Sequence, residues 1–331
     1  MSPDAPTIIA FEHGIYAIDT KFAGSTLMVA SHLIVDNDEA AFVDVGSNFS
    51  IPILLAALDE LGIARKQVRY VCVTHVHLDH AGGAGQIMQD LPAATLVVHP
   101  RGARHMIDPS ALYEGARQVY GTETMKKHHG TLIPVAEDRI LEVHDGDTLR
   151  LGNRTLSFLD TPGHALHHYC IHDNTASAVF SGDTFGISYR SLDTDRGPFI
   201  FPAATPVQLD PQKAHESVER ICALKPHAVY LTHFSQVTAV DDLARQLHGD
   251  LDAYATIGRK YMAADPDQHG IRRDLKALFS KRLREHGWNL SDEDLEQTLG
   301  MDITLNTQGI VVWSAKQFRQ ATSTSKAWVA S

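Results

Sequence analysis

The feature that most constrains this chain is a group of histidine and aspartate side chains directly after an apolar run. Residues 71–83 read VCVTHVHLDHAGG, so a strand-like run leads into His75, His77, Asp79 and His80, followed by two glycines. Side chains two positions apart on extended backbone point the same way, which directs both His75 and His77 toward one point while Asp79 and His80 turn toward a second. Imidazole and carboxylate groups are common ligands of zinc and similar ions. The segment therefore predicts a metal site carried on a short loop.

Three further segments place a single histidine or aspartate after a predicted strand. One strand leads into DTPGHA, where the Pro-Gly turn presents His164. A second ends in GDT, where the glycine permits close backbone approach and Asp183 can bridge two ions. A third ends directly at His233. Because a pair of metal ions needs more ligands than one loop donates, these three residues are the candidates for completing the site.

The order of these motifs resembles the metallo-β-lactamase superfamily, whose signature is HxHxDH, a later GH, a bridging Asp and a final His. The resemblance implies two metal ions, the first held by His75, His77 and His164, the second by Asp79, His80 and His233, with Asp183 shared. Asp44, in the segment AFVDVG, matches the superfamily's first motif and is expected behind the ligands, where it fixes the loop or an imidazole proton.

The fold implied by this resemblance is α/β, a four-layered αββα sandwich with the site along one edge of the sheets and a C-terminal helical extension. Apolar periodicity predicts strands over much of the first part of the chain, including residues 131–135, and a helix over residues 51–61. Helices alternate with a strand after residue 210. Such interleaving is typical of a layered α/β protein.

The organisation expected along the chain is one catalytic domain, residues 1–264, followed by a helical extension, residues 265–331. Within the extension the helical pattern is clearest over 272–286 and 292–299. Residues 186–208 form a loop longer than most connections inside a compact domain, and such loops often border an active site.

The predicted ligand set favours hydrolysis. Two divalent ions bring four positive charges, and the carboxylates of Asp79 and Asp183 with a shared hydroxide leave the cluster close to one positive charge. Paired metals lower the pKa of a shared water to near neutrality and polarise the attacked group. Asp79 and Asp183 are the candidates for carrying a proton to the leaving group. Zinc is the expected metal, with iron and manganese as alternatives.

The bond that is cleaved stays open between several classes. An ester, thioester or lactone is favoured over a phosphodiester, and aromatic side chains in or beside the long loop are candidates either for an acyl pocket or for core packing, namely Phe185, Tyr189, Phe199 and Phe201. The alternative from another class is a mononuclear non-haem iron oxidoreductase of the persulfide dioxygenase type, which uses a similar loop with one iron.

The composition of the chain limits the classes of binding partner that we expect. A formal net charge of −11 disfavours nucleic acid, which is bound through clustered Lys and Arg. The chain lacks a signal peptide pattern and an apolar run of roughly 20 residues, so we expect a cytoplasmic protein with no membrane contact and a small-molecule substrate, anionic groups included. A homodimer stays open. The remaining histidines near or between motifs are given no ligand role, namely His99, His128, His129, His144, His167, His168 and His215.

Overall fold

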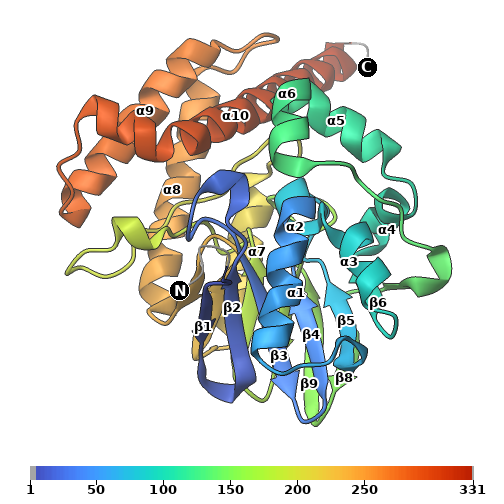
Figure 1. Ribbon diagram of the computed structural model, residues 1–331. Coiled ribbons are helices and arrows are strands. Elements are labelled where there is room, and N and C mark those ends of the chain that lie inside the picture. Colours follow the sequence, from blue (N-terminus) through green and yellow to red (C-terminus); the bar gives the residue numbers. More distant parts are fainter. Residues whose placement is uncertain (1–4, 330–331) are drawn as a thin grey trace.

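The computed structural model describes residues 5–329 and shows two β-sheets packed face to face (Figure 1). The first sheet runs in the order β1 (Ile8–Ala10), β2 (Ile15–Asp19), β3 (Ala30–Asp36), β4 (Glu39–Val43), β5 (Val68–Cys72), β6 (Thr95–Val98), β7 (Ile140–Glu142). The second runs in the order β13 (Ser235–Val237), β12 (Ala228–Leu231), β11 (Ala178–Gly182), β10 (Tyr169–Asp173), β9 (Arg154–Asp160), β8 (Thr148–Leu151). Both sheets are mixed, with parallel pairing at β4–β5–β6–β7 and at β11–β12.

Helices surround the two sheets and pack on their outer faces or on one another. They are α1 (Ile51–Glu60), α2 (Leu78–Ala81), α3 (Ala84–Asp90), α4 (Pro100–Ile107), α5 (Ser110–Tyr120), α6 (Thr122–Thr124), the π-helical turn η5 (Met125–His129), α7 (Pro211–Ala223), α8 (Val240–Lys260), α9 (Gln268–His286) and α10 (Asp292–Val329). Short 3-10 helices are η1 (Glu12–Gly14), η2 (Phe22–Gly24), η3 (Asn48–Ser50), η4 (Arg65–Gln67), η6 (Glu137–Arg139) and η7 (Arg190–Leu192). The C-terminal helices α9 and α10 lie against α8 (Figure 1).

Alternation of side chains along the strands produces the layers. On β3 and β4, Leu33 and Phe42 pack with α1, α3 and α4, whereas Ile34 and Val43 face the second sheet and meet Phe158. Because successive strand residues point to opposite faces, apolar side chains at every position bury both faces of the sheet. The outer face of the second sheet packs on α7 and α8 in the same way. The predicted four-layered α/β sandwich is confirmed.

Most predicted elements are present, but one strand is wrong. The helix predicted over residues 51–61 is confirmed as α1. Residues 131–135 form no strand; instead the backbone N–H of Val135 donates to the carbonyl of Met106 in α4, and Ile133 crosses Gly85 of α3. Pro134 has no N–H for a strand ladder, so this apolar run packs across helices without pairing in a sheet.

The C-terminal helices are longer than the sequence pattern indicates. The Asp267 side chain accepts a hydrogen bond from the N–H of Gly270 and caps α9, which ends at Gly287 with φ 104°. Helix α10 continues far beyond the predicted stretch 292–299. Among the described residues, no helix combines the length and the apolar character needed to cross a membrane. The division of the chain after residue 264 stays a prediction.

The long loop between β11 and α7 joins the C-terminal helices to the sandwich. Phe199 and Phe201 are buried and pack with Tyr254 of α8, Phe279 of α9 and Ile303 of α10. For these two phenylalanines the core-packing interpretation is therefore confirmed. The loop fixes where α10 lies relative to the edge of the sheets.

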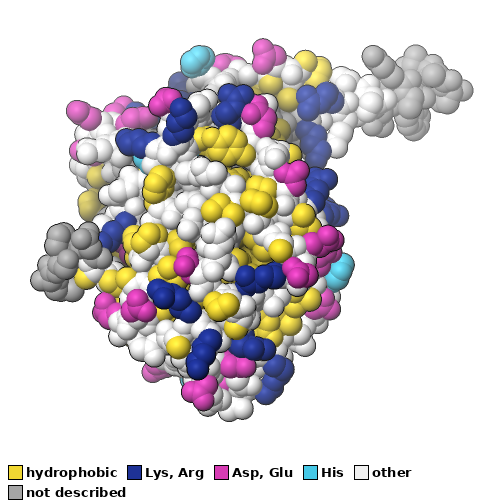
Figure 2. Space-filling view, turned by 45° about the vertical axis from the view of Figure 1, so that its right-hand side comes forward, with side chains coloured by type: hydrophobic (Ala, Val, Ile, Leu, Met, Phe, Trp, Pro, Cys, Tyr) yellow, Lys and Arg dark blue, Asp and Glu magenta, His cyan; other side chains and the backbone are white. Residues whose placement is uncertain are grey.

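On the face of the molecule shown in Figure 2, Lys and Arg side chains are interspersed with Asp and Glu side chains, and apolar side chains lie among them. The acidic balance of the whole chain, a formal net charge of −11, is thus not accompanied on this face by an extended tract of one sign.

The close approach of α10 to the loop predicts a strong effect of one methyl group. A Cβ atom at Gly309 would lie 1.8 Å from the carbonyl oxygen of Ala204. Because this contact is with backbone, we expect Gly309→Ala to lower the free energy of unfolding by about 1–3 kcal/mol in urea denaturation. The matched control is Gly249→Ala in α8, where a Cβ meets nothing within 4 Å and the better helix former should be neutral or stabilising. Equal stability of the two variants would contradict this packing.

A histidine lies in the apolar layer between the sheets. His32 of β3 is buried, its Nε2 has no partner among the described residues, and its ring meets Phe180 and Tyr230 edge-on with centroids 5.5 Å apart in each case. Burial lowers the pKa of His32 to about 4, although the Asp44 carboxylate opposes this shift. The imidazole is therefore neutral in the folded protein at neutral pH.

This shift predicts acid sensitivity with a defined sign. The unfolded chain takes up the His32 proton near pH 6.5 and the folded chain only near pH 4, so the folded state binds fewer protons in this window and loses stability as the pH falls. In His32→Phe this contribution is absent. Relative to the variant, the wild type should lose about 3 kcal/mol between pH 7 and pH 4 in urea unfolding. Parallel pH profiles of the two proteins would show that His32 is not responsible.

Candidate metal centre

The predicted ligands meet at one edge of the sandwich, where strands from both sheets end. The loop between β5 and α2, together with α2, carries four of them, and the segments after β9, β11 and β12 carry one each. They form three overlapping groups suited to holding a metal ion: His75, His77 and His164; His75, His80 and Asp183; Asp79, His80 and His233. All seven residues predicted as ligands are thus brought together.

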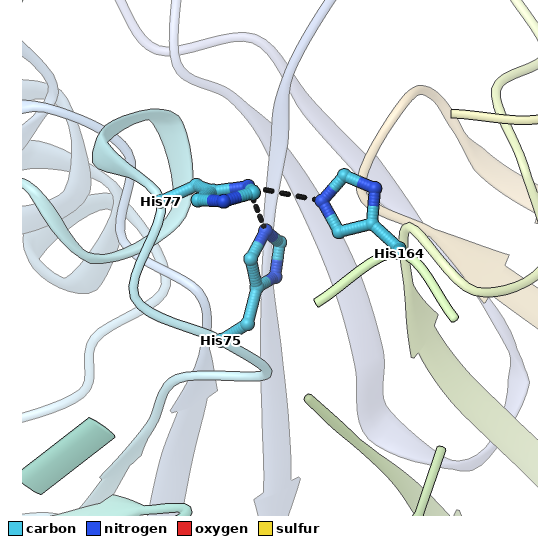
Figure 3. Close-up of side chains that lie close together, drawn as sticks. All are labelled: His75, His77 and His164. Atoms are coloured by element: carbon cyan, nitrogen blue, oxygen red, sulfur yellow. Dashed lines mark hydrogen bonds between the residues drawn. The ribbon is translucent and has the colours of Figure 1, made fainter. Parts of the chain in front are cut away.

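Three imidazoles converge in the first group (Figure 3). The Nδ1 atom of His77 lies 2.9 Å from the Nε2 atom of His75 and 2.9 Å from the Nε2 atom of His164. A single proton on the His77 nitrogen cannot satisfy two ring nitrogens at once with good geometry. A cation held by this group would accept a lone pair from each of the three imidazoles.

Asp183 lies between the group of His75, His77 and His164 and the group of Asp79, His80 and His233. Its Oδ2 atom is 3.3 Å from the Nε2 atom of His164, and its Oδ1 atom is 3.2 Å from that of His80 and 3.5 Å from that of His233. In the group with His80 and His233, the Oδ2 atom of Asp79 lies 3.4 Å from the Nε2 atom of His233 and 3.7 Å from the Nε2 atom of His80. The two oxygens of Asp183 therefore face different groups, as a shared ligand requires.

Hydrogen bonds behind the cluster set the direction of its imidazoles. The Nδ1 atom of His80 lies 2.8 Å from Oδ2 of Asp44, and the Nδ1 atoms of His164 and His233 lie 2.8 and 3.0 Å from backbone carbonyl oxygens. Since these oxygens accept, each Nδ1 carries the proton and donates it. Each Nε2 then presents a lone pair to the cluster.

Asp44 is fully buried and organises three chain segments. Its carboxylate accepts from the backbone N–H of Thr74 at 2.8 Å, from the Thr74 hydroxyl at 2.9 Å, from the Thr232 hydroxyl at 2.8 Å, and from His80. Asp44 itself has φ 55°, an uncommon conformation for a residue other than glycine. The geometry fits the supporting role predicted for Asp44.

Two buried atoms of the cluster lie 3.2 Å apart without forming a hydrogen bond. Nε2 of His80 and Oδ1 of Asp183 form no hydrogen bond among the described residues. Burial and the neighbouring imidazoles lower the pKa of both His75 and His77 well below the usual range, so these rings stay neutral and able to bind a metal. Burial lowers the pKa of His80 as well, but nearby carboxylates outweigh it and raise that pKa well above the usual range. The donor set therefore fits divalent cations, and it balances poorly without positive charge.

A residue that was given no role lies directly beneath Asp183. His168 is buried, its Nε2 accepts from the backbone N–H of Asp183 at 3.2 Å, and its Nδ1 lies 2.9 Å from the Thr161 hydroxyl. Gly182, with φ 49°, allows this approach, because a Cβ there would lie 2.6 Å from both His168 Nε2 and the Thr74 hydroxyl. The only sequence signal was the position of His168 four residues after His164. We infer that it positions the Asp183 backbone.

Comparison with known proteins identifies the family. The model of the metallo-β-lactamase superfamily matches residues 24–233, which carry the whole cluster. This chain belongs to the metallo-β-lactamase superfamily.

Its curated relatives are distant. The metallo-β-lactamase fold-containing protein ST1585 of Sulfurisphaera tokodaii is 27% identical over 168 residues, 50% of this chain and 59% of that protein. A solved structure of ST1585 has a TM-score of 0.60 at 22% identity, covering 82% of this chain and 99% of the other, which shows a shared fold. The acyl-coenzyme A thioesterase MBLAC2 of Gallus gallus is 27% identical over 181 residues, 51% of this chain and 62% of that protein. The hydroxyacylglutathione hydrolase of Maricaulis maris is 30% identical over 149 residues, 45% of this chain and 44% of the enzyme. The match thus spans only about half of these curated relatives.

In this member of the superfamily a pocket opens over the cluster. Its floor contains His77, Asp79, Asp183 and His233. Among the aromatic residues predicted as wall candidates, Tyr189 lines this pocket, whereas Phe185 is buried in the core beside α7 and α8.

Other segments complete the walls, and the individual residues that they contribute were not anticipated. Tyr120 and His129 come from α5 and η5, and Asp302 comes from α10. The Tyr189 hydroxyl donates to Oδ1 of Asp302 at 3.1 Å and so ties the loop to α10. No motif or spacing marks these residues, because each reaches the pocket only through packing of segments far apart along the chain.

The support given by Asp44 predicts a loss of metal without loss of fold. Asp44→Asn keeps the shape but replaces one oxygen by a donor NH₂, which cannot accept from His80 or Thr232. We expect metal affinity to fall about 10- to 100-fold, measured as metal content after dialysis against a weak chelator. The control is His144→Ala, an exposed histidine outside the cluster. Metal content equal to wild type would contradict a role for Asp44.

Proposed function

We propose that this protein is a binuclear metallo-hydrolase that cleaves an ester, thioester or lactone, with zinc as the expected metal and iron or manganese as alternatives. The observation that carries the proposal is the position of Asp183, whose two oxygens face separate ligand groups at the floor of a pocket. Two divalent ions held by these groups would supply a hydroxide nucleophile at neutral pH and polarise the attacked carbonyl.

The chain's own residues divide the remaining work by their access to the pocket. The side chain of Asp79 is 26% exposed, whereas that of Asp183 is 5% exposed. Asp79 is therefore the better placed to accept a proton from the attacking water and deliver it to the leaving sulfur or oxygen, while the water oxygen bonds to the acyl carbon. Asp183 is the better placed to hold the two ligand groups together.

The relatives favour a thioester within this range of bonds. One relative is named an acyl-coenzyme A thioesterase and another a hydroxyacylglutathione hydrolase. Since identity is low and the match covers only part of these proteins, their names support the class of bond and not the identity of the acyl or thiol group.

The arrangement argues against the oxidoreductase alternative. A single iron would require only one set of ligands, and the trio His75, His77 and His164 would be sufficient with Asp183. Asp79, His80 and His233 nevertheless form a second set, in which the Nδ1 atoms of both histidines are hydrogen-bonded behind the cluster and both Nε2 atoms face it. A phosphodiesterase remains the weaker alternative within hydrolysis.

The experiment combines metal analysis with a substrate panel. Protein purified without added metal should contain close to two equivalents per chain and hydrolyse a small thioester, ester or lactone in preference to a phosphodiester. His77→Ala removes the nitrogen on which the first group converges, so kcat/KM should fall by at least about 100-fold, while His144→Ala should retain it. One equivalent of iron, no hydrolysis and oxygen uptake with a thiol substrate would overturn the proposal.

A further inference from the structure

Part of the pocket wall lies outside the region that this chain shares with its superfamily. The family match covers residues 24–233, whereas Phe22 precedes it, and Met301, Asp302 and Leu305 of α10 follow it by many residues. The predicted ligand cluster lies within the shared region. A substrate group that contacts α10 would consequently meet residues outside the segment that the family model describes.

Helix α10 is held in a fixed register against the loop that borders the pocket. The side-chain oxygen of Asn306 accepts from the backbone N–H of Ala204 at 2.7 Å, and its amide NH₂ donates to the Tyr254 hydroxyl at 3.2 Å. Met301 and Leu305 are four positions apart and so lie on the same face of the helix, which is the face turned to the pocket. Met301 is 60% exposed, which places it at the mouth of the pocket.

Apolar side chains face α10 from other segments of the wall. Phe22, Met28 and Val29 come from the segment before and at the start of β3, and Ile187 comes from the loop after β11. Together with Met301 and Leu305 they form an apolar lining that leads from the mouth toward Asp79 and Asp183. Burial of methylene groups against such a lining removes apolar surface from water and so stabilises a bound apolar chain.

The charged residues of the pocket wall disfavour an anionic group. Among the described residues that line this pocket none is Lys or Arg, and Asp302 is the only acidic residue outside the predicted ligand cluster. A carboxylate or phosphate bound between these walls would lose water without gaining a Lys or Arg partner, and it would lie near the Asp302 carboxyl group. The wall therefore opposes an anionic group at this position, although the cluster at the floor attracts a polarised oxygen.

We propose that this pocket holds the acyl group of the substrate and selects an uncharged, apolar acyl chain over a chain that ends in a carboxylate. The inference rests on the proposed hydrolase function and narrows its substrate class. The reacting carbonyl lies over the cluster, and the chain extends between α10 and the segment containing Phe22 toward the mouth at Met301.

The test is a matched series of thioesters on one neutral leaving group. Acetyl, hexanoyl and adipoyl thioesters of N-acetylcysteamine differ only in chain length and in a terminal carboxylate. With the metal-loaded wild type we expect kcat/KM to rise from acetyl to hexanoyl and to be about 100-fold lower for adipoyl than for hexanoyl, with most of the difference in KM.

A charge placed at the mouth should shift this preference. Met301→Lys supplies the missing cation, so the hexanoyl-to-adipoyl ratio should fall by about tenfold, as expected for a newly paired carboxylate. Met262→Lys makes the same substitution at an exposed methionine that does not line the pocket and should leave the ratio unchanged. A ratio that responds equally to both variants would indicate a general charge effect and overturn the assignment of the pocket.

The outcomes separate this inference from the proposed function. Hydrolysis of all three thioesters with similar kcat/KM would overturn the acyl selection and leave the hydrolase proposal standing. Failure to hydrolyse any of the three, or the small ester and lactone of the substrate panel, by protein with two equivalents of metal would overturn both. A strong preference for hexanoyl that Met301→Lys reduces would support both.

Discussion

The buried carboxylate of Asp44 is the interaction on which the rest of the site depends. It follows β4 and accepts hydrogen bonds from Thr74 after β5, from Thr232 after β12, and from His80 of α2. One side chain therefore fixes the ends of strands from both sheets and the direction of an imidazole between them. Because the group is fully buried, these charge-assisted hydrogen bonds act where water does not compete. The loops that carry the other candidate ligands leave the sheets beside these same strand ends.

Buried polar side chains have different surroundings between the two sheets and at the edge of the sandwich. His32 lies between the sheets, and burial keeps it neutral. At the edge, the carboxylates of Asp79 and Asp183 lie around His80, and Nε2 of His80 and Oδ1 of Asp183 form no hydrogen bond among the described residues. Bound cations would balance the negative charge of these carboxylates. The same desolvation that makes an unpaired group costly in a core makes the edge a strong site for divalent ions. This contrast supports a metal centre over a surface turn of polar residues.

The candidate ligands and part of the pocket wall come from different regions of the chain. The region shared with the superfamily, residues 24–233, contains every candidate ligand. The walls of the pocket draw on α10, and Asn306 and Gly309 hold that helix against the loop at Ala204. Membership of the superfamily thus supports the class of chemistry that we propose, and α10, which lies beyond residues 24–233, forms part of the wall that the proposed acyl group would contact.

The sequence by itself determined the local parts of this protein. The spacing within residues 71–83, the turns at Gly163 and Gly182, and the periodicity of residues 51–61 depend on neighbouring positions. They predicted α1 and the side chains that the fold brings together at the edge of the sheets, while the sandwich was implied by the resemblance of the motif order to a known family. Only the tertiary structure decided that residues 131–135 pack without pairing, and that α5, η5 and α10 wall the pocket. Ligand spacing is written along a few consecutive residues, whereas a pocket wall is formed by contacts between distant segments, which no local pattern encodes.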